Sequence, residues 1–250
     1  MTTVSAQPTA TAPPTDTAWP TVRKRVEKLA AERITAFQRG YLADSPKDVA
    51  ALARLRRGAG REAGQLPDLW NLVDTTPLHE PHEGPHSLSE KQLAQAEDAL
   101  HVALTLWALH QQSRGEAGMH QSGSPGKPRG VGAAVHRMMK PGEIDEPLRK
   151  RLVRVGTAPD LTTLAQRLRD IVLLLRREQF PLDYALLAGQ LYHWQQPGGP
   201  DAVRREWGRS FHAWHENDRN AEGRTPAADP ATTAGTTDTS ETTTTDKDAS

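Results

Sequence analysis

Apolar residues recur at steps of three to five along most of the central chain, and this spacing restricts the fold more than any other feature. The first such set is Val22, Val26, Leu29, Ala30, Ile34, Phe37 and Tyr41. This is the spacing of the apolar face of a surface helix. No stretch shows the alternation that would predict a strand. The sequence therefore predicts an all-α fold of about eight or nine helices, built as one bundle or as two small helical halves.

Capping residues predict where several of these helices begin and end. Ser45 before Pro46, with Asp48 three residues on, predicts a capping box, and Gly58 predicts a left-handed end. Ser87 with Glu90 predicts the start of a helix that continues to about Gln112. The expected helices are 22–41, 46–57, a short one near 66–73, 87–112, 131–140, 147–155, 160–179, 182–194 and one from Pro200 onward.

Composition divides the chain into a central domain and two tails. The first 18 residues are mostly Thr, Ala and Pro, and residues 221–250 lack any large apolar side chain. Such segments cannot offset the entropy lost on ordering, so we expect disordered tails at 1–18 and 221–250. Residues 19–220 are expected to form the helical domain. Within it, the Gly-, Ser- and Pro-rich segment 113–130 is expected to be a mobile, peripheral loop.

The formal net charge of +0 conceals two basic segments. Residues 19–57 hold ten basic and four acidic residues, and residues 129–177 hold eleven and five. Acidic sequence elsewhere, including the C-terminal tail, balances them. Local basic surfaces are therefore expected on a chain that is neutral as a whole.

Several classes of protein are excluded or disfavoured. The chain has no cysteine, which removes disulfides, thiolate metal sites and cysteine nucleophiles. No apolar run approaches the roughly 20 residues of a membrane span, and the N-terminus does not resemble a secretion signal. We therefore expect a cytoplasmic protein with no membrane association.

Enzymatic motifs are also lacking, because neither a phosphate-binding glycine loop nor a nucleophile elbow is found. The best metal candidate combines His79, His82 and His86 with Glu80 and Glu83. Imidazole and carboxylate are zinc ligands, but this spacing matches no helical zinc motif, so a polar loop is the favoured interpretation. The hypothesis of a metal-dependent hydrolase would require bound zinc. The sequence thus predicts no enzyme, no cofactor and no metal.

Basic residues are the candidate functional groups. In "RKRLVR", residues 149–154, Leu152 and Val153 are expected to point inward while Arg149, Lys150, Arg151 and Arg154 spread over the exposed arc. Arg137 on the preceding helix and Arg167 and Arg169 on the following one would extend this surface. Arg54, Arg56 and Arg57 lie at the end of helix 46–57, where the helix dipole accounts for one or two cations.

Three interpretations of these cations remain open: a nucleic-acid backbone, an acidic protein partner, or an ordinary solvated surface. Stacking of bases on aromatic side chains is the minority interpretation. Phe37, Tyr41, Trp107, Trp207, Phe211 and Trp214 fall at core spacings.

A series of ordered motifs between residues 20 and 216 resembles the CasB family, the small subunit of the type I-E CRISPR complex Cascade. The motifs are "LARLRRG", "ALTLWALHQQ", "MHQSGSPG", "GVGAAVHRMM", "RLVRVGTAPDLTTLAQRLRDIVLLLR", "PLDYALLAGQLYHW" and "VRREWGRSFHAW". The resemblance implies an all-helical, non-enzymatic protein of antiviral defence, present in two copies. It would pack along the CasC backbone near CasA and help to hold the crRNA and the target and displaced DNA strands of the R-loop.

The resemblance also assigns residues. Arg56 and Arg57, Arg151 and Arg154, and Arg167 and Arg169 match basic positions of the family, whereas Ala133 stands where the family has an arginine. Arg129 or Arg137 would substitute for that arginine. The expected nucleic-acid-binding residues are Arg54, Arg56, Arg57, Arg129, Arg137, Arg149, Lys150, Arg151, Arg154, Arg167 and Arg169.

Overall fold

The computed structural model is helical throughout the residues that it describes, which are 21–79, 88–140 and 143–222, the last ten by their backbone alone. Strand pairing within these residues is limited to isolated bridges, so the all-α prediction is confirmed. The expected tails lie outside these ranges, apart from residues 221 and 222. The elements are α1 (Val22–Leu42), α2 (Pro46–Leu55), η1 (Arg56–Gly58), η2 (Ala63–Gln65), η3 (Pro67–Leu69), α3 (Trp70–Val73), α4 (Thr76–His79), α5 (Glu90–Gln111), α6 (Val131–Arg137), α7 (Glu146–Gly156), α8 (Leu161–Glu178), α9 (Tyr184–Trp194) and α10 (Gly199–Glu222).

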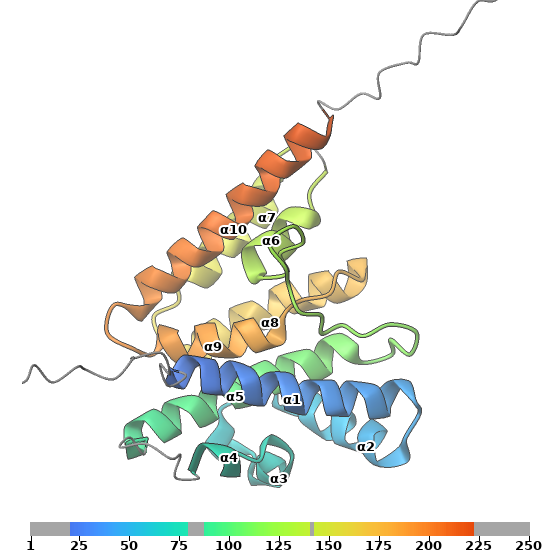
Figure 1. The fold of residues 1–250 in the computed structure, drawn as a ribbon, viewed down its shortest axis with the longest axis vertical. Coiled ribbons are helices and arrows are strands. Elements are labelled where there is room, and N and C mark those ends of the chain that lie inside the picture. Colours follow the sequence, from blue (N-terminus) through green and yellow to red (C-terminus); the bar gives the residue numbers. More distant parts are fainter. Residues whose placement is uncertain (1–20, 80–87, 141–142, 223–250) are drawn as a thin grey trace, which may run out of the picture.

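The central helices α1, α5, α8 and α9 hold the molecule together (Figure 1). Helix α1 packs on α9 and α5, and α5 packs on both α8 and α9. Helices α2 to α4 adjoin α1 and α5 at one end, while α6 and α7 adjoin α10 at the other. None of the helices within the described residues combines the length and apolarity that a membrane crossing needs.

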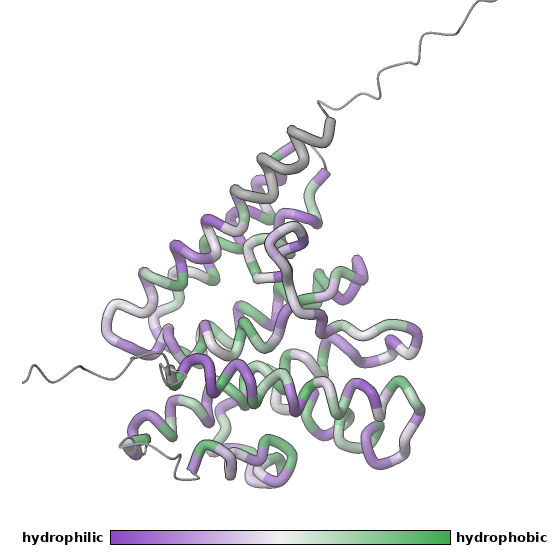
Figure 2. Tube along the Cα trace, viewed as in Figure 1, coloured by the Kyte–Doolittle hydropathy of each residue, from purple (hydrophilic) through white to green (hydrophobic). Residues whose placement is uncertain are grey.

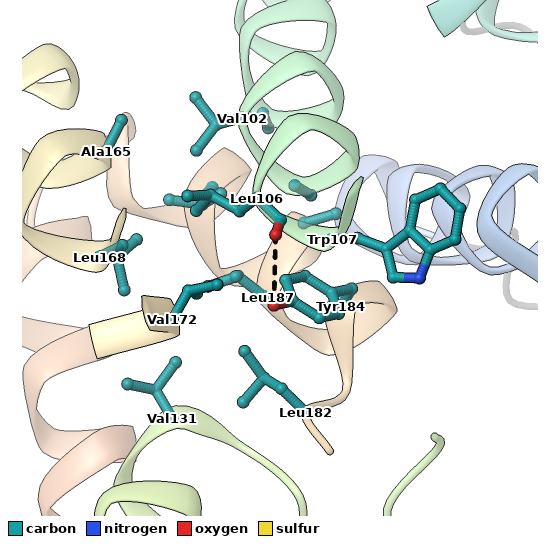
Figure 3. Packing of buried hydrophobic residues seen from close by; sticks show 14 of the residues in the cluster. Val102, Leu106, Trp107, Val131, Ala165, Leu168, Val172, Leu182, Tyr184 and Leu187 are labelled. Atoms are coloured by element: carbon teal, nitrogen blue, oxygen red, sulfur yellow. Dashed lines mark hydrogen bonds between the residues drawn. The ribbon is translucent and has the colours of Figure 1, made fainter. Parts of the chain in front are cut away.

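The core is one continuous cluster that connects both ends of the fold. In Figure 3, Leu106 and Trp107 of α5 lie with Val172 of α8 and Tyr184 of α9. The buried Tyr184 hydroxyl donates to the carbonyl oxygen of Leu106 at 3.5 Å. In Figure 2, hydrophobic and hydrophilic residues alternate with the turns of α1, as expected for a helix with one buried face.

The predicted capping of α2 is wrong in two respects. The helix begins at Pro46 as expected, but the Ser45 side chain makes no capping hydrogen bond. The Asp48 carboxylate instead lies over Gly40 of α1, where no side chain obstructs it. Gly58 belongs to the 3-10 turn η1, and the left-handed backbone occurs at Gly60 with φ 83°. Gly58 packs against Thr105 and His101 of α5, so the left-handed turn occurs two residues later, at Gly60.

The start of α5 also differs from the expectation. The capping residue is Ser89, whose hydroxyl accepts from the Gln92 amide, while the Gln92 side chain accepts from the Ser89 amide. The predicted cap, Ser87, lies outside the described residues. Ser87 and Ser89 are each followed three residues later by Glu or Gln, so both fit the capping-box pattern. The sequence alone therefore could not determine which serine caps the helix.

Segment 113–130 is irregular as predicted, but it is not peripheral. Met119 and His120 are buried, and the Leu182 amide donates to the Met119 carbonyl at 3.0 Å. Gln38 of α1 accepts from the His120 amide at 2.9 Å and donates to its carbonyl at 3.1 Å. The Asp183 carboxylate accepts from the Gly123 amide at 2.9 Å. Side chains of α1 and of the α9 cap therefore fix a segment whose own sequence predicts no order.

Candidate nucleic-acid interface

The structure separates the predicted cations into three groups. The α7 cluster is Arg149, Lys150, Arg151, Arg154 and Arg167. The α2-end cluster is Arg54, Arg56, Arg57 and Arg169. The inner pair is Arg129 and Arg137.

Helix α7 presents the first group because only one of its faces is covered. The Asp145 carboxylate accepts from the Leu148 amide at 3.0 Å and caps the helix. Leu152 and Val155 are buried, which turns the basic side chains outward. The inward orientation expected for Val153 is wrong, since its side chain is 54% exposed. Residues 152 and 153 differ by about 100° around a helix, so one face cannot bury both when Val155 is its other buried residue.

In the described part of the chain, four cations of the α7 cluster form no ion pair with a carboxylate: Lys150, Arg151, Arg154 and Arg167. Arg149 pairs with Glu146 at 2.8 Å, and this hydrogen bond raises the pKa of Arg149 and lowers that of Glu146. Arg151 and Arg154 are exposed, and neither side chain forms an ion pair or hydrogen bond with any of the described residues. Arg167 of α8 donates to the Arg154 carbonyl oxygen, which brings the two helices' cations together.

The α2-end cluster surrounds the turn that follows η1. Arg57 approaches Asp68 at 3.8 Å, and Arg54 donates to the backbone carbonyl of Asp68. A Cβ at Gly60 would lie 3.4 Å from the Cδ of Arg169, so the turn packs directly beside α8. Arg56 is half-buried on the same turn. This cluster joins segments more than 100 residues apart in the sequence.

The α7 cluster and the α2-end cluster lie on different sides of α8. Arg167 faces α7, whereas Arg169 faces the turn at Gly60. Two residues along an α-helix correspond to about 200° of rotation, which accounts for this separation. The sequence grouped Arg167 with Arg169, and the structure instead assigns them to separate surfaces.

The inner pair is not on the exposed surface. Arg129 is only 7% exposed, and Arg137 is half-buried with its guanidinium carbon 4.8 Å from the Phe180 ring centroid. Burial lowers the pKa of both arginines, and the charge of Arg129 lowers the pKa of Arg137 further. Ala133, where the resembled family has an arginine, is fully buried. The expectation that α6, α7 and α8 each expose their predicted arginines therefore fails at α6.

The metal hypothesis gains no support from the described residues. The His79 ring nitrogen lies 3.2 Å from a carboxylate oxygen of Glu97, while His82 and His86 lie outside the described ranges. Within those ranges no three potential ligands come together as a metal site would require.

Sequence reasoning did not identify Trp70 as a surface residue. It stands at the start of α3 and is 62% exposed, unlike the other described tryptophans. The sequence offers one indication of this exposure, which is that Trp70 follows the short Pro67–Leu69 turn and begins a helix of four residues. Such a short helix has little capacity to bury a large ring.

Residues 51–212 match the family model of CRISPR-associated protein Cse2. A crystal structure of CasB from Thermobifida fusca is similar with 49% sequence identity and a TM-score of 0.66, over 75% of this chain and 97% of that one. A chain of a CRISPR RNA-guided surveillance complex shares the fold at 19% identity and a TM-score of 0.58, over 79% of this chain and 99% of that one. No curated protein matches the sequence.

Over the ranges that the structure describes, the fold defines an all-helical protein with exposed cations that no described carboxylate pairs. More specifically, the chain belongs to the CRISPR-associated Cse2 family, whose members include CasB. It is therefore a non-catalytic subunit of the CRISPR Cascade type, as the motifs predicted.

Proposed function

We propose that this chain stabilises a type I-E Cascade complex and its R-loop by binding nucleic-acid backbone through the α7 cluster. The observation that carries the proposal is the exposure of Arg151 and Arg154 without an anionic partner among the described residues. A phosphate backbone supplies evenly spaced anions, and each contact releases a condensed counterion. The described residues do not neutralise these charges, and a polyanion would.

The R-loop gives such contacts a functional role. Replacing a DNA duplex by an RNA–DNA heteroduplex is a nearly balanced exchange, so a few fixed cations can shift it toward the open form. The crRNA, the target strand and the displaced strand are the strands available to the α7 cluster. The α2-end cluster would contribute a second contact, weaker because Asp68 already engages two of its arginines.

The protein partners follow from family membership and from the resemblance. We propose assembly in the cytoplasm with the CasC backbone, with CasA and with a second copy of this chain. The similarity in fold to a chain of an RNA-guided surveillance complex supports this placement. The alternative function is a structural adaptor whose basic faces bind acidic protein surfaces.

Charge reversal on α7 distinguishes the two functions. The double variant Arg151→Glu with Arg154→Glu is compared with Lys28→Glu and Arg39→Glu, an equal change of charge at exposed positions on α1. Cascade is assembled with each variant, and both subunit content and R-loop lifetime are measured. The proposal predicts intact assembly and a shorter R-loop lifetime for the α7 variant alone. Loss of the subunit from the complex would instead support the adaptor.

A further inference from the structure

We infer that a trough beside α3 receives an arginine or lysine side chain from a protein partner. The trough is formed by Ala63, Gly64, Trp70, Glu97, Asp98 and His101. Figure 1 shows α3 and α4 at the opposite end of the molecule from α7. The inference concerns a surface separate from the α7 cluster and does not depend on the nucleic-acid contacts proposed for that cluster.

The trough has a shape suited to one side chain with its flanking backbone. Its volume is about 330 Å³, at the lower end of ligand-binding pockets. It continues into a second cavity of about 300 Å³ toward Leu161 and Thr162 of α8, with which it shares Ala63, Gly64, Asp98 and His101. Trp70 provides an exposed aromatic wall, which α3 cannot cover because it is four residues long.

The charges along the trough are predominantly negative. Asp98 makes no hydrogen bond or ion pair with any of the described residues, and burial, Glu97 and Glu62 raise its pKa in that order. Glu97 accepts from the Thr75 hydroxyl at 3.1 Å and lies 3.2 Å from the His79 ring. Glu62 accepts from the Thr162 hydroxyl at 2.9 Å. Glu97 and Asp98 line the trough and Glu62 lines the adjoining cavity, so a cation between them would relieve the repulsion that Asp98 experiences from both glutamates.

An exposed tryptophan beside carboxylates favours a cation on a protein over a nucleic acid. A guanidinium or ammonium group over the face of a tryptophan is attracted to the ring, and the nearby carboxylates strengthen that preference. The same carboxylates would repel the phosphates that accompany a stacked base. Arg61, which lines the adjoining cavity, is exposed and forms no ion pair with the acids among the described residues.

Two substitutions in the trough test the inference. Trp70→Ala removes the aromatic wall, and Asp98→Asn removes one charge while retaining its shape. Each variant is titrated into an assembly of the other Cascade subunits with crRNA, and the concentration giving half-maximal incorporation is measured. Affinity of the isolated chain for a single-stranded oligonucleotide is measured in parallel. We expect half-maximal incorporation to require about fivefold more protein, in the range of a partly desolvated cation–π contact, with oligonucleotide affinity unchanged.

Matched controls make the outcome specific. Trp70→Phe retains an aromatic face and should recover most of the incorporation, while Asp170→Asn removes an exposed acid from α8 and should have no effect. Thermal unfolding establishes whether each variant is folded. If Trp70→Ala is not folded, the incorporation of Asp98→Asn alone tests the inference. Unchanged incorporation for both trough variants would overturn the inference. A parallel loss of oligonucleotide affinity would also overturn it, because the occupant would then be a nucleobase.

Discussion

His110 lies at the centre of the core, where its surroundings favour the neutral imidazole. Burial lowers its pKa to about 3, and its Nδ1 lies 2.9 Å from the Tyr184 hydroxyl. As the pH falls, the unfolded chain binds a proton at this residue near its ordinary pKa of about 6.5, well before the folded chain does. The free energy of unfolding is therefore unaffected by His110 above about pH 7 and decreases between pH 6.5 and 3.

The size of this effect is measurable at moderate acidity. At pH 5 the loss attributable to His110 is about 2 kcal/mol, since each pKa unit corresponds to roughly 1.4 kcal/mol. His101 and His120 have pKa values lowered by burial as well, so the whole protein loses more. Urea unfolding gives the free energy of unfolding at pH 7 and at pH 5. The decrease between the two pH values should be about 2 kcal/mol smaller in His110→Gln than in the unmodified protein. An equal difference in both would show that His110 does not titrate in this way.

At Gly132, helix α6 packs tightly against the backbone of α10. A Cβ there would collide with the carbonyl oxygen of Trp207 and the hydroxyl of Ser210. Because the Trp207 carbonyl is backbone, the helices themselves would have to separate. Gly132→Ala should lower the free energy of unfolding by about 2–3 kcal/mol, as overpacked cores do.

Denaturant titration measures this directly, and α10 provides the control. A Cβ at Gly208 would meet no atom within 4 Å, so Gly208→Ala should be neutral or stabilising by up to about 1 kcal/mol. If both alanines had the same effect, the close approach at Gly132 would not be the cause.

At the scale of elements, segment 113–130 shows how an irregular connection is fixed in place. Gln38 of α1 accepts from the Trp107 indole nitrogen at 3.3 Å and from the His120 amide at 2.9 Å. Gln38→Leu would leave both buried donors unsatisfied, at a cost of about 1–3 kcal/mol each. Hydrogen exchange at the His120 amide should accelerate at least about tenfold.

The comparison variant for this element is Gln95→Leu. Gln95, at the other end of α5, forms hydrogen bonds with Gln195 at 3.1 and 2.8 Å and none with a described residue of the segment. Exchange at His120 should be the same in Gln95→Leu as in the unmodified protein. Unchanged exchange in Gln38→Leu would mean that the remaining hydrogen bonds, among them those of Gln111, Leu182 and Asp183, are sufficient to hold the segment.

Elements with one buried face were predicted well from the sequence, and contacts between distant segments were not. Helices α1 and α8 begin and end within two residues of their predicted bounds, because a single apolar stripe determines them. The docking of segment 113–130 depends on Gln38 and Asp183, which local propensity does not relate to it. The burial of Arg129 and the exposure of Trp70 have the same origin, since each depends on packing against elements remote in sequence.

In the candidate site, too, features of a single helix could be predicted from the sequence and contacts between distant segments could not. The outward orientation of Arg151 and Arg154 follows from helical geometry and could be predicted, as could their lack of local acidic partners. The division between the α7 and α2-end clusters could not, because it requires the placement of α8 between α7 and the Gly60 turn. A chain with formal net charge +0 thus separates its charges in space.

At the scale of the whole molecule, the fold places the α7 cluster and the acidic trough at different ends, while the α2-end cluster lies close to the trough. The α7 cluster lies at one end, and the trough with Trp70 and Asp98 lies at the other. Such an arrangement suits a subunit that contacts nucleic acid on one side and a protein neighbour on another. It also predicts that substitutions at the two ends act independently, because distant sites without shared partners are additive.

The central claim is that unpaired cations on α7 bind a phosphate backbone, and the salt dependence of binding tests it most directly. If about four phosphates are contacted, the affinity for a single-stranded oligonucleotide should fall about 50-fold between 50 and 200 mM salt. The double variant Arg151→Glu with Arg154→Glu should reduce the slope of log affinity against log salt by about 1 to 1.5. A flat salt response, or an identical slope in the variant, would contradict the account.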